Sequence, residues 1–160
     1  MSKDVFWIAN TGLAIVARPH GDELLKDDLS RLKNAGIQVL VSTVEEWEAH
    51  ALGLASEGQL ARGLGIEFMS YPMRDRSTPS NRENFTSFAK SLATRLDAGE
   101  KIGVHCRGCI GRSTVVTACT LITMGWSAKD ALRSIEIARE FPVPDTDEQY
   151  AWILAFGAAR

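Results

Sequence analysis

The densest group of residues that could do chemistry lies at positions 105–113 and reads HCRGCIGRS. Cys106 carries a thiol, and the thiolate form of such a group is a strong nucleophile. Arg112 carries a planar guanidinium that can donate two parallel hydrogen bonds to an oxyanion such as phosphate. Gly108 and Gly111 allow the backbone to approach an anion closely. These residue types predict a nucleophile beside a phosphate-binding loop.

The segment falls between a predicted strand at 101–105 and a predicted apolar helix at 112–124. In open α/β sheets, ligands bind where strands end and helices begin. Loop N–H groups and the positive end of the helix dipole favour an anion there, and they favour the thiolate of Cys106 over the thiol. We therefore expect the phosphate to be held by consecutive residues of the loop, namely Arg107, Gly108, Cys109, Ile110, Gly111 and Arg112.

Short apolar runs alternate with amphipathic runs along the chain, which predicts strands and helices in turn. Strands are expected at 6–9 and 13–17 (a hairpin around 10–12), 37–41, 66–71 and 101–105. Helices are expected at 22–35, in patches over 45–64, from a capping box at 80–83 to about 96, at 112–124, from 127 with Asp130 as cap, and at about 146–156. The alternation predicts one α/β domain over residues 1–160 around a mostly parallel sheet.

The composition argues against several function classes. The chain has 160 residues, 45% of them hydrophobic, with a formal net charge of -2, so it lacks the basic excess of a nucleic-acid-binding surface. Its three cysteines are too few for a disulfide scaffold, and no apolar run approaches the length of a membrane span. We expect a cytoplasmic protein with no nucleic-acid or membrane partner. The sequence does not determine the oligomeric state, and our working expectation is a monomer.

The order His-Cys, five residues, Arg-Ser resembles the signature of cysteine-dependent protein tyrosine phosphatases, in particular compact dual-specificity-type members from bacteria. The segment 71–79 (YPMRDRSTP) resembles the mobile acid loop of that family, and 144–149 (PDTDEQ) resembles its Gln-bearing loop. The resemblance covers most of the chain. It implies a central sheet of four to five strands flanked by helices on both faces, with a Cys-x5-Arg phosphate-binding loop.

The resemblance also implies a two-step reaction. Cys106 would attack the phosphorus of a phosphomonoester, while Arg112 and the loop amides stabilise the charge on the phosphoryl oxygens. Asp75 would protonate the leaving oxygen and would later take a proton from the water that attacks the phosphocysteine. His105 would order the loop and support the low pKa of the Cys106 thiol without touching substrate. Ser113 would stabilise the departing thiolate, and Gln149 would position the water. No metal or organic cofactor is needed.

Several of these residues also have a simpler interpretation. Asp75 can be a turn former, with Asp97 as another nearby carboxylate. Gln149 can be a solvated residue at the start of a helix, and Ser113 can be an ordinary hydroxyl in a first helical turn. Three arginines, which can be solvated or can gather around the pocket to attract anions, flank the two loops: Arg74, Arg76 and Arg107.

Cys109 adds a second thiol within the loop and creates a C-x-x-C pattern. It can be a small apolar filler, or it can be a resolving thiol that captures oxidised Cys106 as a disulfide. Cys119 lies within the apolar helix and is expected to be a core residue. The C-x-x-C pattern also leaves open a thiol–disulfide redox function.

The sequence thus favours a phosphatase that acts on phosphotyrosine in proteins, with phosphoserine and phosphothreonine as further substrates. A phosphoinositide or nucleotide phosphatase with the same mechanism remains an alternative. So do the redox function and a phosphate-recognising module without turnover. The expected partner is a phosphorylated protein or a small phosphomonoester.

Overall fold

The computed structural model describes residues 4–108 and 110–159, and its centre is a five-stranded sheet in the order β1-β2-β5-β3-β4. β1 pairs antiparallel with β2, and the other three pairings are parallel. The mostly parallel sheet predicted from the sequence is confirmed. The strands are β1 (Val5–Trp7), β2 (Leu13–Val16), β3 (Val39–Ser42), β4 (Glu67–Ser70) and β5 (Ile102–His105).

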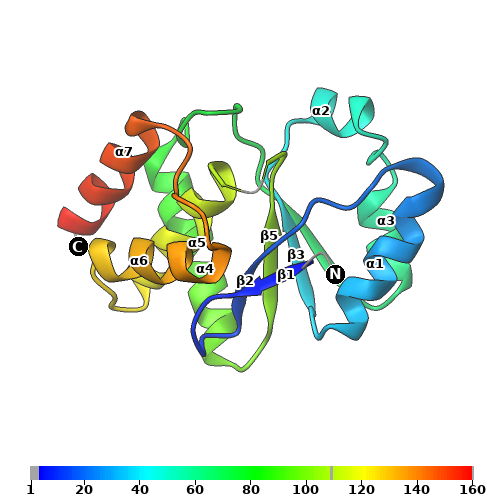
Figure 1. Cartoon of the computed structure of the whole chain (residues 1–160), viewed down its shortest axis with the longest axis horizontal. Coiled ribbons are helices and arrows are strands. Elements are labelled where there is room, and N and C mark those ends of the chain that lie inside the picture. The colour runs from blue at the N-terminus through cyan, green and yellow to red at the C-terminus, as the bar shows by residue number, and fades with distance from the viewer. Residues whose placement is uncertain (1–3, 109, 160) are drawn as a thin grey trace.

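Helices cover both faces of the sheet, with α1 and α3 on one side and α4 to α7 on the other (Figure 1). α2 lies on the α1 side, beside the carboxyl end of the strands (Figure 1). Within the described residues, no helix is both long and apolar enough to cross a lipid bilayer. The helices are α1 (Leu25–Asn34), α2 (Glu46–Ala51), α3 (Glu57–Gly63), α4 (Arg82–Asp97), α5 (Arg112–Thr123), α6 (Ala128–Arg139) and α7 (Asp147–Ala158), with a short 3-10 turn at Asp22–Leu24.

Each face of the sheet packs its own hydrophobic cluster. Leu25 and Leu29 of α1 pack with Leu40 of β3 on one face, whereas Phe85 of α4 and Ile153 of α7 belong to the cluster on the other. α5 is buried along almost its whole length, from residue 112 to residue 122. The hydroxyls of Thr117 and Thr120 donate to carbonyl oxygens of the same helix, so these polar side chains can be buried. The buried position fixes the N-terminus of α5 against the end of β5.

The crossovers place a crevice between the ends of β3 and β5. The chain passes from β2 over β5 to β3, continues outward to β4 and then returns to β5, so its direction across the sheet reverses. Such a reversal opens a crevice at the carboxyl ends of the strands, where α/β proteins bind ligands. Thr43, just after β3, donates from its backbone N–H and its hydroxyl to the carbonyl oxygen of His105, at 3.1 and 2.9 Å. These bonds fix the point at which residue 106 leaves the sheet.

Several helix starts differ in detail from the sequence-based prediction. α4 is capped by the side chain of Asn81, which accepts from the backbone N–H of Asn84, rather than through a box begun by Ser80. α6 is capped by Ser127, and Asp130 instead supplies the N–H that this cap satisfies. An N-cap needs extended backbone and a short side chain that reaches the third helical N–H, and Asn81 and Ser127 meet both conditions. The predicted strands at 37–41 and 66–71 also shift or shorten by one or two residues at their ends.

Gly103 allows β2 and β5 to pack closely in the middle of the sheet. A β-carbon at this position would lie 2.6 Å from Val16 Cγ1 and 3.1 Å from Ile37 Cδ1. We expect Gly103→Ala to lower the free energy of unfolding by about 1–3 kcal/mol, as overpacked cores do, in urea titrations followed by circular dichroism. Gly63→Ala is the matched control, because nothing lies within 4 Å of a β-carbon at the end of α3. Equal stability of the two variants would contradict this account of the packing.

Candidate active site

The segments singled out in the sequence meet around one cavity of about 230 Å³. It lies in the crevice at the carboxyl end of β5. The predicted acid loop, the loop that follows β5 and the segment before α7 all contribute to its wall. Its lining residues are Asp75, Arg76, Cys106, Arg107, Gly108, Ile110, Gly111, Arg112 and Asp145.

Cys106 is buried at the base of this cavity, between the end of β5 and the start of α5. Its sulfur lies 3.3 Å from the hydroxyl oxygen of Ser113, which is also buried. α5 begins at Arg112, so the positive end of its dipole lies next to the sulfur. A hydroxyl donor and a helix N-terminus both stabilise a thiolate relative to a thiol. Ser113 thus lies within hydrogen-bond distance of the sulfur, and its role toward a departing thiolate stays a prediction.

Arg112 is buried and forms a two-pronged ion pair with Glu48 of α2, which is also buried. Nη1 and Nη2 of the arginine lie 2.6 and 2.9 Å from the two carboxylate oxygens. Burial disfavours the charged carboxylate, but the hydrogen bonds and charge of Arg112 outweigh that effect and lower the pKa of Glu48. Because two parallel bonds fix a guanidinium in its plane, Glu48 sets the orientation in which Arg112 faces the cavity.

The acid loop reaches the same guanidinium from the other side. Arg112 Nη1 donates to the carbonyl oxygen of Met73 at 2.9 Å, and Nη2 lies 3.3 Å from a carboxylate oxygen of Asp75. Asp75 is half-exposed and lines the cavity, whereas the alternative carboxylate, Asp97, is exposed at the end of α4 and is absent from the lining. The geometry therefore favours Asp75 over Asp97 as the candidate acid.

Gln149 is fully buried and ties two loops together. Its carbonyl oxygen accepts from the backbone N–H groups of Asp145 and Thr146, and its amide donates to the carbonyl oxygen of Ser77 at 3.0 Å. A β-carbon on Gly111 would lie 3.0 Å from both polar atoms of the Gln149 side chain, so the glycine permits this close approach. Gln149 is therefore no solvated helix residue. Its role in positioning water stays a prediction.

The predicted gathering of arginines is only partly seen. Arg107 and Arg76 line the cavity, and Arg76 pairs with Asp145 at 3.0 Å. Arg74 is exposed and does not belong to the lining. The positive charge that faces an incoming anion therefore comes chiefly from Arg112 and Arg107.

His105 is completely buried and is held through both ring nitrogens. Nε2 lies 2.6 Å from a carboxylate oxygen of Glu57, and Nδ1 lies 3.3 Å from the carbonyl oxygen of Cys106. Burial disfavours the imidazolium, but the Glu57 carboxylate more than compensates, so the pKa of His105 is raised. The predicted loop-ordering histidine thus has an acidic partner on α3.

Neither buried glutamate was predicted from the sequence. Glu48 is one of three closely spaced glutamates (EEWE at 45–48), and Glu57 looks like a routine acidic residue in a first helical turn. In the structure Glu48 also closes a capping box with Glu45, whose backbone N–H donates to Glu48 Oε1 at 3.0 Å.

Of the two remaining cysteines, Cys119 and Cys109, only Cys119 lies within the described residues. Cys119 is buried within α5, as expected for a core residue, and burial raises the pKa of its thiol. Cys109, with its predicted contributions to phosphate binding and to redox chemistry, lies outside the described residues. Across the described part of the chain, no cluster of three or more histidine, cysteine or acidic side chains could hold a metal ion.

Comparison with known proteins adds an independent line of evidence. Residues 14–126 match the model of a family described as "Polymorphic toxin system, DSP-PTPase phosphatase". The chain belongs to this family. The DSP-PTPase match includes β5, Cys106, Arg112 and Asp75, and thus every residue that lines the cavity except Asp145.

Individual relatives agree with the family. The chain is 30% identical over 141 residues to "Putative tyrosine phosphatase 067L" of Invertebrate iridescent virus 3. The aligned region covers 78% of this chain and 56% of that protein. It superposes on kinase associated phosphatase, solved with its catalytic-site cysteine changed to serine, with a TM-score of 0.82, 25% identity and coverage of 92% and 88% of the two chains. A structure of PTPMT1 in complex with PI(5)P shares the fold, with a TM-score of 0.80, 20% identity and coverage of 98% and 96%.

The chain spans just over half the length of the viral relative. The similarity to this relative therefore concerns the DSP-PTPase domain and not the whole viral protein.

The ion pair between Glu48 and Arg112 makes a prediction about this DSP-PTPase domain. Glu48→Gln leaves Arg112 buried beside an uncharged partner, so we expect the free energy of unfolding at pH 7 to fall by about 3–5 kcal/mol. Because Arg112 lowers the pKa of Glu48, the stabilisation is complete above the ordinary value of 4.5 and is lost as the pH falls below it. Urea titrations between pH 7 and pH 3 should show the gap between wild type and variant narrowing. Glu46→Gln, on the exposed side of the same helix, should cost less than about 1 kcal/mol, and an equal loss in both variants would argue against the ion pair.

Proposed function

We propose that this protein hydrolyses phosphomonoesters, chiefly phosphotyrosine in proteins and also phosphoserine and phosphothreonine, through a phosphocysteine intermediate on Cys106. The observation that carries the proposal is that Asp75, from the separate loop before α4, lines the same cavity as Cys106 and Arg112. This arrangement supplies a nucleophile, an oxyanion-binding group and a proton donor within reach of one phosphate group.

In the first step, the Cys106 thiolate attacks phosphorus in line with the ester oxygen. A sulfur–phosphorus bond forms, and the oxygen–phosphorus bond to the leaving group breaks. Negative charge on the equatorial oxygens is met by the loop amides and by Arg112. Within the described residues, Nε of Arg112 is buried without a hydrogen-bond partner, while its two Nη atoms are held by Glu48. Nε is thus a donor that remains available to a phosphate oxygen.

Asp75 supplies the proton in this proposal. A phenolate or alkoxide leaves poorly, and protonation of the ester oxygen by a carboxylic acid lowers that barrier. In the second step, the Asp75 carboxylate takes a proton from water as the water attacks the phosphocysteine, releasing phosphate and the Cys106 thiolate. Ser113, 3.3 Å from the sulfur, stabilises that thiolate as it departs.

A phosphoinositide is the second candidate substrate. The exposed side chain of Arg107 lies at the cavity wall and could meet the additional phosphates of an inositol headgroup. One protein of the same fold, PTPMT1, was solved in complex with PI(5)P. Hydrolysis rates for phosphotyrosine, phosphoserine and phosphothreonine peptides, inositol phosphates and nucleotides would rank the candidates. The proposed preference requires phosphotyrosine peptides to give the highest kcat/KM.

Cys106→Ser tests the nucleophile. A serine hydroxyl is not ionised at neutral pH, so we expect hydrolysis of p-nitrophenyl phosphate in the presence of EDTA to fall to the uncatalysed background. Cys119→Ala is the matched control, because that thiol is buried in the core and absent from the cavity lining. It should retain turnover. Full activity in Cys106→Ser would eliminate the mechanism.

Asp75→Asn tests the acid. The amide cannot transfer the proton, so kcat for p-nitrophenyl phosphate should drop about 10²- to 10⁴-fold, while vanadate, a phosphate analogue, still binds in a competition assay. Asp97→Asn makes the same chemical change on the exposed end of α4. Its kcat should match that of the wild type. The reverse ranking of the two variants would move the role to Asp97.

A further inference from the structure

Glu57 and His105 form a second buried ion pair behind the phosphate loop. The two side chains are 3% and 0% exposed, and 2.6 Å separates Glu57 Oε2 from His105 Nε2. Glu57 is the first residue of α3, whereas His105 is the last residue of β5 and directly precedes Cys106. The pair therefore links a helix on one side of the sheet to the residue from which the loop departs.

The histidine has little freedom to move or to exchange partners. Its Nδ1 faces the carbonyl oxygen of Cys106 at 3.3 Å, and its own carbonyl oxygen accepts from Thr43. Ring and backbone are thus both anchored next to the nucleophile. Burial of a charged pair is costly, and a buried ion pair is weak evidence for a stabilising role. We therefore look for a role of the buried Glu57 carboxylate in the site itself rather than in stability.

We propose that Glu57 is a positioning residue of the active site: it holds His105 as a fixed imidazolium, and that cation favours the thiolate of Cys106. The inference rests on the proposed function, in which Cys106 is the nucleophile. Glu57 touches neither substrate nor sulfur in this account and acts through His105 alone.

The charges around His105 support this direction of effect. Among the described residues, the titratable groups that act on it are Glu57 from α3 and Cys106 beside it; burial opposes its charge, and both groups raise its pKa. Arg112, which pairs with Glu48 and lies 3.3 Å from Asp75, also acts on Cys106, but its charge is the same in all the variants compared below. Electrostatic coupling is reciprocal, so the imidazolium must favour the thiolate as much as the thiolate favours the imidazolium. Without the carboxylate, burial would make the imidazole neutral and remove that support.

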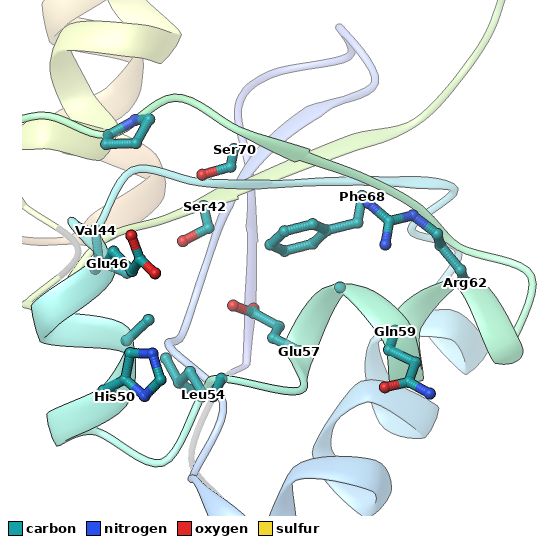
Figure 2. Close-up of a pocket in the computed structure, with 14 residues that line it drawn as sticks. Ser42, Val44, Glu46, His50, Leu54, Glu57, Gln59, Arg62, Phe68 and Ser70 are labelled. Carbon is teal, nitrogen blue, oxygen red and sulfur yellow. The ribbon is translucent and has the colours of Figure 1, made fainter.

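Glu57 also faces a second cavity, of about 520 Å³, between α2, α3 and the sheet. Figure 2 shows its side chain extending from the start of α3 into this space, with Glu46, His50 and Arg62 at other points of the wall. Glu46 is exposed, and the described contacts give it none with His105. Glu46→Gln therefore removes one negative charge from the same cavity without touching the ion pair, which makes it the matched control for Glu57→Gln.

The test is the pH dependence of the Cys106 thiolate. Full-length wild type, Glu57→Gln and Glu46→Gln would be alkylated with iodoacetamide from pH 4.5 to pH 9, and modification of Cys106 would be followed by peptide mass spectrometry. In Glu57→Gln we expect the thiolate titration to move up by about one pH unit, which corresponds to about tenfold slower alkylation on the acidic side. The acidic limb of kcat/KM for p-nitrophenyl phosphate should move with it. Rates at pH 9 should be the same in all three proteins.

A double variant separates action through His105 from a general structural effect. In a His105→Asn background, Glu57→Gln should cause no further shift in the Cys106 titration, because the group that transmits its effect is gone. A further shift of the same size would overturn the proposal. An equal shift in Glu57→Gln and Glu46→Gln would also overturn it, because cavity charge alone would then account for the effect.

A measurement on the wild-type protein keeps the proposal testable even if Glu57→Gln does not fold. The chain has three histidines, so the imidazole ¹⁵N resonances of His105 can be assigned by NMR. We expect His105 to be protonated at pH 7, and a neutral ring at that pH would refute the proposal. Failure here is distinguishable from failure of the proposed function, since an active Cys106→Ser variant would reject the nucleophile regardless of His105.

Discussion

The buried ion pair between Arg112 and Glu48 is the interaction on which the rest of the site depends. It joins α5 on one face of the sheet to α2 on the other, across the crevice at the ends of β3 and β5. The same guanidinium reaches Met73 and Asp75 of the acid loop. One pair of side chains thus fixes the proposed phosphate-binding donor, the position of the predicted acid loop and the contact between the two sides of the sheet.

A second set of contacts holds the loops against each other from outside. Gln149 binds the backbone of the acid loop and of the segment before α7, and Gly111 leaves room for it beside the phosphate loop. Because these segments lack regular secondary structure, their positions come from such cross-loop bonds rather than from their own backbone ladders. Loops held on a rigid sheet in this way can carry preorganised chemistry.

The strands and helices could be predicted from the sequence more accurately than the residues at which they begin and end. The sheet and the principal helices follow from alternating apolar and amphipathic runs, because a strand or helix must bury one face or its whole surface. The caps at Ser80 and Asp130 were wrong by one and by three positions, since Asn81 and Ser127 are the residues with the required extended backbone. Gln149 was predicted for its place near the site, but its burial and its three loop contacts are visible only in the fold.

The sequence by itself predicted which residues of the loop after β5 could do chemistry. Cys106, Arg112 and Ser113 lie within eight residues of one another, on one loop and the helix that follows it, so their spacing already specifies their geometry. Only the tertiary structure decided which acids serve that loop. Glu48 and Glu57 meet Arg112 and His105 across 64 and 48 residues, and they are two of 20 acidic residues in the chain. Local sequence pattern cannot show which of these carboxylates becomes buried beside a cation. A buried charge needs a partner, and the partner is brought close only when elements far apart in the sequence pack together.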